Sequence, residues 1–348
     1  MRLAWIGWVG LSLAACAAPE VTPPISEIAQ TEPTKPWRFD DHANALKIAS
    51  CPDGTAFERA QALTITATQI DRGTTDQQAV ALQNMRFAGA WHLTADDSNF
   101  GGLSGLAVLR SGSLLAVSDT GAFVWIGIDP GTGAPDGLGS IGYMRDGKGK
   151  LFVGKAAADA EDLVLRDGLA LVSFEQEHRI EAFDLEGCGA AARAAHVVDL
   201  PGVVDGKKVP RNKGTEALAL DDALWAGYEM RQLQGSPMGR VLSDGSLDQL
   251  SYAGQPGLYL QTGADFNARG RAVIYRAYDP ARGTRVILEV QGKDGATAKA
   301  ALKPPLPVDN FEGVAFGRAP SGATRIWLIS DDNFSAKQRT LLFAFDLD

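Results

Sequence analysis

One pattern recurs five times between residues 103 and 332. Each copy has a short apolar segment, a turn rich in glycine or aspartate, and a second apolar segment that ends in polar residues. The copies are anchored at Ser104, Glu161, Glu216, Asp265 and Glu312, so their spacings are 57, 55, 49 and 47 residues. A four-stranded propeller blade takes about 40 to 50 residues. The spacing therefore predicts an all-β fold, a β-propeller of five to six blades.

The ends of the repeat array suggest how the ring closes. Residues 341–347 form an apolar strand after the fifth copy, and residues 86–93 form another before the first copy. We expect this N-terminal strand to join the last blade, because that pairing removes a free sheet edge. A further apolar segment at 62–70 leaves the choice between five and six blades open.

The repeat also predicts where its acidic residues gather. The inner strand of a blade lines the central channel, and the antiparallel second strand returns to the end where the first began. The start of each copy and the end of its second strand should therefore meet at one channel mouth. The expected neighbours are Ser104 with Asp119, Glu161 with Glu175, Glu216 with Glu229, Asp265 with Arg276, and Glu312 with Asp331 and Asp332.

So many carboxylates in one concavity repel each other, by about 4 kcal/mol for a pair about 4 Å apart at an effective dielectric constant of about 20. A bound cation, basic partners or raised pKa values must offset this. Calcium fits best because it takes six to eight oxygen ligands, whereas zinc prefers His and Cys. The expected metal ligands are Glu161, Glu175, Glu216, Glu229, Glu312 and Asp331, and the expected catalytic residues are Glu161, Glu216, Glu312 and Asp119.

A structural reading of the same glutamates stays open. Each one could accept hydrogen bonds from the backbone of a neighbouring loop, or pair with Arg211, Lys213 or Arg276. A serine-nucleophile site is disfavoured, because the sequence around Ser104 lacks the last glycine of a Gly-x-Ser-x-Gly elbow and no helix follows.

Several of these segments together resemble one family. They are residues 101–106, 118–121, 161–164, 172–176 with 178–180, 215–218, 310–315 and 330–334. This part of the chain, roughly residues 86 to 348, resembles the phytase-like family, described as having esterase-like activity of phytase. The resemblance implies an envelope or secreted propeller that hydrolyses phosphate or other esters. The candidate substrate-binding residues are then Ser104, Arg211, Lys213 and Arg276.

The N-terminus looks like an export signal. Residues 1–15 read as a lipoprotein signal peptide, because a thirteen-residue apolar run ends in Leu-Ala-Ala before Cys16. Residues 16–40 then form a lipidated cysteine and a Pro-rich tether, 41–85 an N-terminal extension and 86–348 the propeller. We expect the chain to be lipid-anchored in a bacterial envelope, at the outer membrane facing the periplasm. There Cys51 and Cys188 could pair as a disulfide or remain two thiols.

Composition removes one class of function. The net charge is −9 and no Lys/Arg cluster is present, which excludes nucleic acid as a partner.

Two functions remain from the sequence. One is a calcium-dependent hydrolase of a small ester or phosphoester. The other is a non-catalytic ligand- or protein-binding propeller lipoprotein, with the membrane contacted only through the N-terminal lipid.

Overall fold

The structure is a computed structural model of the chain. It describes residues 34–253 and 258–347. The predicted signal peptide, Cys16 and most of the predicted tether lie outside the described residues. In the described part of the chain, no helix is long and apolar enough to cross a membrane.

Most described strands belong to four-stranded antiparallel blades. Blade 1 contains β4 (Leu103–Val108), β5 (Leu114–Ser118), β6 (Ala122–Ile128) and β7 (Pro135–Tyr143). Blade 2 contains β8 (Ala160–Arg166), β9 (Leu169–Phe174), β10 (Arg179–Asp184) and β11 (Ala195–Asp199). Blade 3 contains β14 (Thr215–Leu220), β15 (Leu224–Tyr228), β16 (Ser236–Val241) and β17 (Leu247–Ala253).

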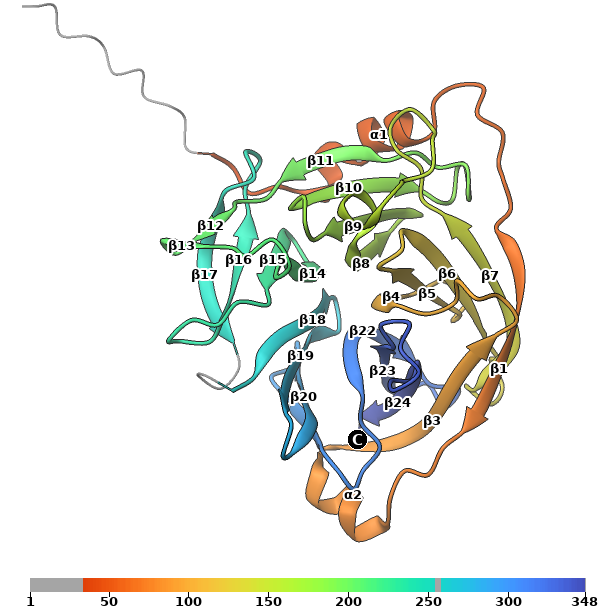
Figure 1. Cartoon of the computed structure of the whole chain (residues 1–348), viewed down its shortest axis with the longest axis vertical. Coiled ribbons are helices and arrows are strands. Elements are labelled where there is room, and N and C mark those ends of the chain that lie inside the picture. The colour runs from red at the N-terminus through yellow and green to blue at the C-terminus, as the bar shows by residue number, and fades with distance from the viewer. Residues whose placement is uncertain (1–33, 254–257, 348) are drawn as a thin grey trace, which may run out of the picture. The chain divides into compact units, whose positions relative to one another are not determined.

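Two further blades complete the ring. Blade 4 contains β18 (Leu260–Asn267), β19 (Gly270–Asp279), β20 (Gly283–Gly292) and β21 (Thr297–Leu302). Blade 5 contains β22 (Asn310–Arg318), β23 (Thr324–Asp331), β24 (Leu341–Leu347) and β3 (Met85–Ala95). The inner strands contact one another in the closed order β4, β8, β14, β18, β22 and back to β4 (Figure 1). The predicted β-propeller is confirmed, and it has five blades.

The N-terminal strands close the ring. β3 pairs with β24, as predicted, with Ala90 opposite Phe343. The apolar segment considered for a sixth blade is β1 (Gln61–Gln69), which pairs with β3 on one side and with β7 on the other. β1 therefore joins the outer edges of blades 5 and 1, so that both edges are paired.

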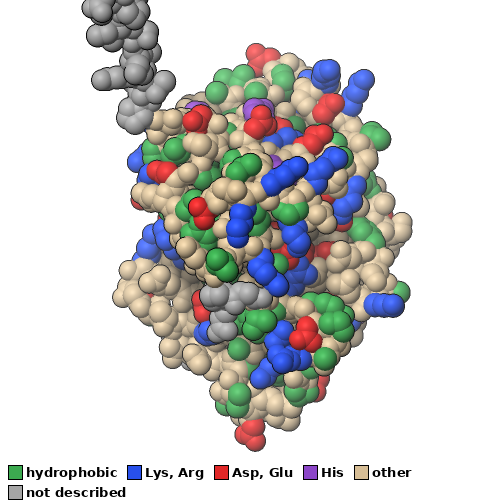
Figure 2. All heavy atoms as spheres, turned by 60° about the vertical axis from the view of Figure 1, so that its left-hand side comes forward, with side chains coloured by type: hydrophobic (Ala, Val, Ile, Leu, Met, Phe, Trp, Pro, Cys, Tyr) green, Lys and Arg blue, Asp and Glu red, His purple; other side chains and the backbone are tan. Residues whose placement is uncertain are grey.

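Three of the remaining elements, α1 (Phe39–Ser50), α2 (Thr75–Ala81) and β2 (Leu82–Gln83), lie on the outside of the ring. The others, α3 (Lys155–Ala158), β12 (Val203–Val204) and β13 (Lys207–Lys208), belong to the segments that lead into blades 2 and 3. Helix α1 contacts β10 and β11, and β2 pairs with β21. Over the face turned forward in Figure 2, acidic and basic side chains are interspersed.

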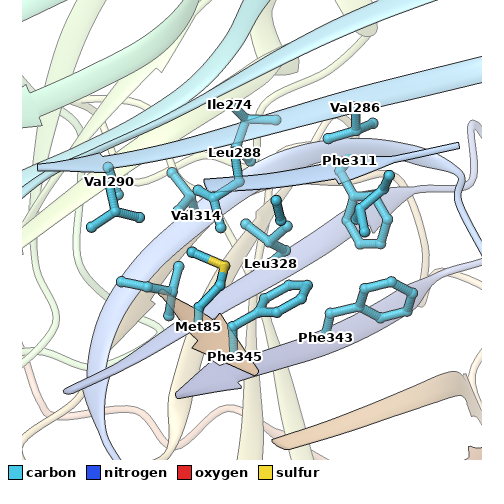
Figure 3. Packing of buried hydrophobic residues seen from close by; sticks show 14 of the residues in the cluster. Met85, Ile274, Val286, Leu288, Val290, Phe311, Val314, Leu328, Phe343 and Phe345 are labelled. Carbon is cyan, nitrogen blue, oxygen red and sulfur yellow. The ribbon is translucent and has the colours of Figure 1, made fainter. Parts of the chain in front are cut away.

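Apolar side chains fill the space between neighbouring blades. Figure 3 shows the cluster between blades 4 and 5, in which Phe311 packs on Phe343 with ring centroids 4.7 Å apart. Near the axis the blades approach more closely than a side chain allows. A Cβ added to Gly105 would lie 2.7 Å from the Cα of Asp162 in the next inner strand. Glycine at this position therefore lets blades 1 and 2 pack together.

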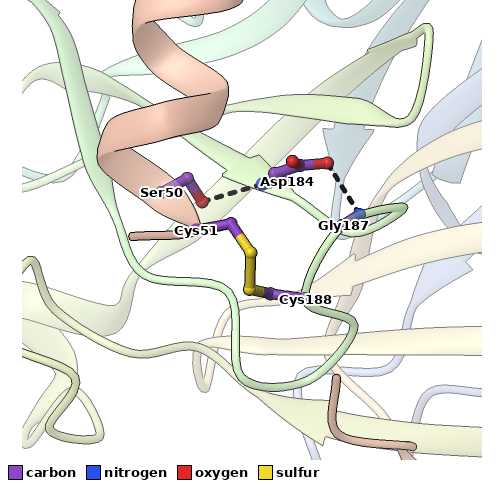
Figure 4. Close-up of a disulfide and its surroundings, with 5 residues drawn as sticks. All are labelled: Ser50, Cys51, Asp184, Gly187 and Cys188. Carbon is purple, nitrogen blue, oxygen red and sulfur yellow. Dashed lines mark hydrogen bonds between the residues drawn. A yellow bond between two sulfur atoms is a disulfide. The ribbon is translucent and has the colours of Figure 1, made fainter. Parts of the chain in front are cut away.

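A disulfide ties the N-terminal extension to blade 2. Cys51, just after α1, is bonded to Cys188 in the loop between β10 and β11, with a Cα–Cα distance of 5.7 Å (Figure 4). Beside it, the backbone N–H of Asp184 donates to Ser50 Oγ at 2.8 Å. The bond spans 137 residues of sequence, a loop for which chain-entropy models give about 5 kcal/mol of stabilisation.

Candidate active site

The same irregularity occurs near the start of all five inner strands. In β8, for example, Ala160 pairs with Phe174 and Asp162 with Ser173, so Glu161 is an extra residue. Such a bulge redirects the side chain of the extra residue. The five bulged residues, called the bulge ring below, are Ser104, Glu161, Glu216, Thr262 and Glu312.

The fourth position of this ring corrects the sequence analysis. Asp265 was expected to face Arg276, but Asp265 pairs with Ala272, and Arg276 pairs with Leu260. Asp265 lies farther along β18, where its Oδ2 accepts a hydrogen bond from the backbone N–H of Phe316 at 2.8 Å. The bulged residue is Thr262. The pattern missed it because a search for recurring acids selects the nearest carboxylate in this copy, and threonine carries none.

A second ring follows the ends of the second strands. It is called the strand-end ring and contains Asp119, Glu175, Glu229, Arg276 and Asp331. The backbone N–H of Glu175, for instance, donates to the carbonyl of Asp159 at 2.9 Å, just before the bulge in β8. The structure therefore brings Glu161 with Glu175, Glu216 with Glu229, and Glu312 with Asp331 to one mouth of the channel. We call this end the acidic mouth.

Basic side chains neutralise one side of the acidic mouth. Arg276 Nη2 lies 3.0 Å from Glu229 Oε1 and 3.4 Å from Glu312 Oε1. Lys213 Nζ lies 2.7 Å from Glu229 Oε2. Asn310 Nδ2 donates to Glu312 Oε1 at 2.9 Å. The alternative expectation, that glutamates of the repeat pair with basic side chains, therefore holds for Glu229 and Glu312.

Arg211 is the predicted site residue with the least support. It is exposed in the loop before β14. Within residues 34–253 and 258–347, no side-chain hydrogen bond or ion pair of Arg211 is found. The structure does not join it to either ring.

The other side of the acidic mouth lacks such compensation. Glu161 is 9% exposed and Glu216 is 7% exposed. Among the described residues, no hydrogen bond or ion pair reaches either carboxylate. Burial, together with the charges of neighbouring carboxylates, raises the pKa of both groups well above the usual range. The charge of Glu312 contributes to both shifts, so its carboxylate lies near enough to both groups to repel them.

Other carboxyl groups of the mouth are shifted in the same direction. Burial raises the pKa of Glu312 to about 8, and nearby Asp331 adds to this shift. Burial also raises the pKa of Glu175 to about 7 and that of Asp331 to about 6. Without a metal, some of these carboxyl groups are therefore protonated near neutral pH. A bound cation would displace those protons.

Three carboxylates form a candidate cation site. One oxygen from each of Asp159, Glu161 and Glu175 lies within 4.8 Å of the others. Asp159 is fully buried, and its Oδ1 lacks an aligned hydrogen bond although Lys155 Nζ is 3.1 Å away. A donor set made only of carboxylate oxygens suits a hard cation. An acidic cluster that can bind a metal is therefore present.

Sequence reasoning missed Asp159 and Lys155. Lys155 Nζ bridges Asp119 Oδ2 and Asp159 Oδ1, each at 3.1 Å. Both residues belong to the helical turn around α3, which precedes the first strand of the second copy. The available signal was a single acid two residues before Glu161, and the corresponding position is acidic in none of the other four copies.

Ser104 does not have the surroundings of a nucleophile. It is buried, and its Oγ points to the carbonyl of Gly102 at 3.5 Å. Gly102 has a φ of 60°, and a Cβ there would lie 3.1 Å from Asp119 Cγ. Glycine is required here, and the Oδ1 of Asp119 is buried without a hydrogen-bond partner.

A cavity of about 640 Å³ lies at the opposite end of the channel, lined by the far ends of inner strands, including Leu106, Leu165 and Leu220. Its volume lies within the range of small-molecule binding sites. We nevertheless place the chemistry at the acidic mouth, because the unpartnered carboxylates lie there. Asp265, a half-buried acid at the far end, already accepts hydrogen bonds from Phe316 and Asn267.

The family model named Phytase-like, described as esterase-like activity of phytase, matches residues 98–334. The chain belongs to this phytase-like family. No curated protein sequence matches it. The matched range of this phytase-like chain contains the whole bulge ring and the whole strand-end ring, from Ser104 to Asp331.

Solved structures resemble the phytase-like chain only distantly. A PQQ-bound aldose sugar dehydrogenase from Streptomyces coelicolor has 12% identity and a TM-score of 0.42, covering 77% of this chain and 98% of that one. A calcium structure of a family AA12 carbohydrate-active enzyme from Trichoderma reesei has 10% identity, a TM-score of 0.39, and coverage of 85% and 100%. The PQQ domain of a pyranose dehydrogenase from Coprinopsis cinerea has 8% identity, a TM-score of 0.39, and coverage of 85% and 99%. The five-bladed fold is established by the strand pairing itself.

Proposed function

We propose that this phytase-like propeller is a calcium-dependent hydrolase of ester or phosphoester substrates at its acidic mouth. The observation that carries the proposal is the pair of buried carboxylates, Glu161 and Glu216, that have no protein partner. Leaving ionised groups buried without compensation is costly. A site that retains them in two successive blades is suited to a bound cation and to proton transfer.

The residues that would hold calcium are Asp159, Glu161 and Glu175, whose oxygens already lie within 4.8 Å of one another. Calcium accepts six to eight oxygen ligands, so water and substrate would complete the shell. This set is narrower than the one expected from the sequence, because Glu229 and Glu312 already pair with Arg276. Bound calcium supplies Lewis acidity toward a carbonyl or phosphoryl oxygen.

Glu216 is the proposed general base. Its carboxylate has no protein partner among the described residues, and burial beside other carboxylates raises its pKa, which makes the ionised group a stronger base. Glu216 takes a proton from water while the water oxygen bonds to the acyl carbon or to phosphorus. The bond to the leaving oxygen breaks, and that oxygen receives the proton. The products are an acid and an alcohol.

Two basic side chains flank this reaction. Lys155 lies between Asp119 and Asp159 on one side of the acidic mouth, and Arg276 lies between Glu229 and Glu312 on the other. Both can donate hydrogen bonds to negative charge that develops on the reacting oxygens. Asp119 holds Lys155 in place through an ion pair of 3.1 Å.

The test is hydrolysis of p-nitrophenyl acetate and p-nitrophenyl phosphate by the purified protein, in calcium and in EGTA. We predict calcium-dependent turnover of at least one substrate and a loss of about 100-fold or more in kcat for Glu216→Gln. Glu289→Gln, at an exposed position on β20, is the matched control and should keep full activity. Activity that EGTA and Glu216→Gln leave unchanged would contradict the proposal. Calcium stabilisation without any turnover would instead support the non-catalytic binding propeller.

We also propose that Cys16 carries the lipid that anchors the chain in the bacterial envelope, facing the periplasm from the outer membrane. The support is the apolar run of residues 3–15 followed by the cysteine. The wild-type chain should be recovered with outer membranes, and Cys16→Ala should not be. Equal recovery of both in the membrane fraction would contradict this.

A further inference from the structure

Phe334 lies at the acidic mouth, and the reaction above gives it no role. It belongs to the loop between β23 and β24, directly after Asp331 and Asp332. A Cβ on Gly102 would lie 2.7 Å from Phe334 Cε2 and 3.1 Å from Asp119 Cγ. The aromatic ring and the carboxylate therefore flank the same glycine. Since Phe334 is 44% exposed, part of its ring is open to solvent beside Asp119.

The backbone around Phe334 is unusual. Asn333 has a φ of 49° and Phe334 a φ of 48°, and this left-handed region is unfavourable for a bulky side chain, by about 1–2 kcal/mol per residue. Asp331 Oδ1 accepts the N–H of Asn333 at 2.6 Å, and Asp332 Oδ1 accepts that of Phe334 at 3.0 Å. Two acids of the mouth thus hold a conformation that keeps an apolar ring half in water. The core does not require such a conformation.

Other exposed apolar side chains lie on the same side of the propeller. At the end of the channel where Glu161 lies, the loops and the strand residues next to them include Val153, Val203, Leu233, Tyr278 and Phe334. In the described chain, none of the large exposed apolar side chains lies in a loop that joins blade strands at the opposite end. The exposed apolar side chains in the blade loops therefore lie on the side of the propeller where the acidic mouth opens, and Phe334 is the one of these five that is placed beside Asp119.

The charge of the mouth limits what such a surface can bind. Arg276 and Lys155 are each already paired with two carboxylates. A doubly charged phosphomonoester would have to share these side chains, and the proposed calcium ion, with the carboxylates around them. An uncharged acyl ester would not, and its acid part could cover the open side of the Phe334 ring.

We propose that Phe334 forms a subsite for the apolar acid part of a carboxylic ester, so that the substrates are esters of aliphatic or aromatic acids. This inference rests on the proposed hydrolase function and narrows it to acyl esters. Covering the ring removes apolar surface from water, and each additional methylene of the acyl chain adds contact area. Phe334 is then a specificity residue of the mouth rather than a catalytic one.

The test compares wild type with Phe334→Asn and Phe334→Leu, using p-nitrophenyl acetate and p-nitrophenyl octanoate in excess calcium. Asparagine tolerates the left-handed backbone and so preserves the turn, whereas leucine preserves apolarity. We expect wild type to prefer octanoate at least tenfold in kcat/KM, Phe334→Asn to lose that preference with acetate turnover unchanged, and Phe334→Leu to retain most of it. Val80→Asn, at an exposed position on α2, is the control.

A binding measurement separates this inference from the proposed function. Sodium octanoate, titrated calorimetrically below its micelle-forming concentration, should bind wild type more tightly than Phe334→Asn, while sodium acetate should not distinguish them. Octanoate binding that depends on Phe334 without turnover of either ester would support the subsite and overturn the hydrolase. Turnover without preference for the longer chain would overturn the subsite alone. Dimerisation of the chain abolished by Phe334→Asn would also overturn it, because the apolar rim would then be a contact between two copies.

Discussion

At the scale of single residues, the structure separates two kinds of acid that look alike in the sequence. Glu229 and Glu312 have basic or amide partners, whereas Glu161 and Glu216 have none among the described residues. The repeat predicted all four, because it detects recurring positions. The sequence offered Lys213 and Arg276 as partners, and both pair with Glu229. It could not tell which glutamates would remain without a partner, since that depends on which side chains of other blades reach the mouth. Asp159 was missed because the corresponding position is not acidic in the other copies.

Arg276 gives a prediction at this scale. Replacing it by methionine leaves Glu229 and Glu312 without their shared cation, and breaking a buried ion pair in this way costs about 3 kcal/mol. The loss should be large at pH 8 and small at pH 5, because the raised pKa of Glu312, about 8, lets it protonate. Thermal unfolding in EGTA at the two pH values measures this. Arg282→Met, at an exposed position, is the control. An equal loss for Arg276→Met at both pH values would contradict the interpretation.

At the scale of elements, the inner strands determine where the site residues lie and how closely the blades pack. The bulge of each strand directs one side chain toward the axis, and in four of the five inner strands the next residue is glycine or alanine, which lets the next blade approach. In β8 the next residue is Asp162, whose Oδ2 accepts a hydrogen bond from the backbone N–H of Leu218 in the neighbouring blade at 2.8 Å. The recurring short apolar segments predicted the inner strands, because one extra residue at a bulge leaves the rest of each apolar segment recognisable in the sequence. They could not predict the bulge itself, which is visible only in the pairing register. The anchor of the fourth copy was therefore placed at Asp265 instead of Thr262.

Gly105 tests the close approach of the blades. A Cβ there would lie 2.7 Å from Asp162 Cα and 2.8 Å from Leu163 N, both backbone atoms. Because backbone cannot move aside as a flexible side chain can, Gly105→Ala should destabilise the protein by about 1–3 kcal/mol in urea unfolding. Gly202→Ala, where no atom lies within 4 Å of the added Cβ, should change stability by less than about 0.5 kcal/mol. Similar values for both variants would show that the blades are less tightly packed than described.

At the scale of the whole molecule, the fold was the most predictable part. Spacing alone indicated a propeller, and the chain ends indicated the pairing of β3 with β24. The role of β1 and the pairing of Cys51 with Cys188 could not be derived, because both depend on which distant segments lie side by side. The seven acidic residues of the two rings gather at the acidic mouth, whereas the face shown in Figure 2 mixes acidic and basic side chains.

The acidic mouth should control how stability depends on pH. The folded, metal-free protein keeps protons on Glu175 and Glu312 up to about pH 7 and 8, whereas the unfolded chain loses them near pH 4.5. The folded state binds more protons in this window, so its stability should fall as pH rises from 5 to 8. Folding lowers the pKa of His178, which by itself would make stability rise with pH, but this is one group against two carboxyl groups. Melting temperatures in EGTA should drop by several degrees across this range, and much less in calcium. A metal-free protein that is equally stable at pH 5 and pH 8 would contradict the description of the mouth.

The most direct test of the central claim is a calorimetric calcium titration of the metal-free protein at pH 8, with wild type, Glu161→Gln and the control Glu289→Gln. The acidic mouth predicts calcium binding by wild type and Glu289→Gln, and binding at least tenfold weaker in Glu161→Gln, because one of three clustered carboxylates is neutralised. Absence of calcium binding in wild type, or equal binding by all three proteins, would contradict a cation site at the mouth.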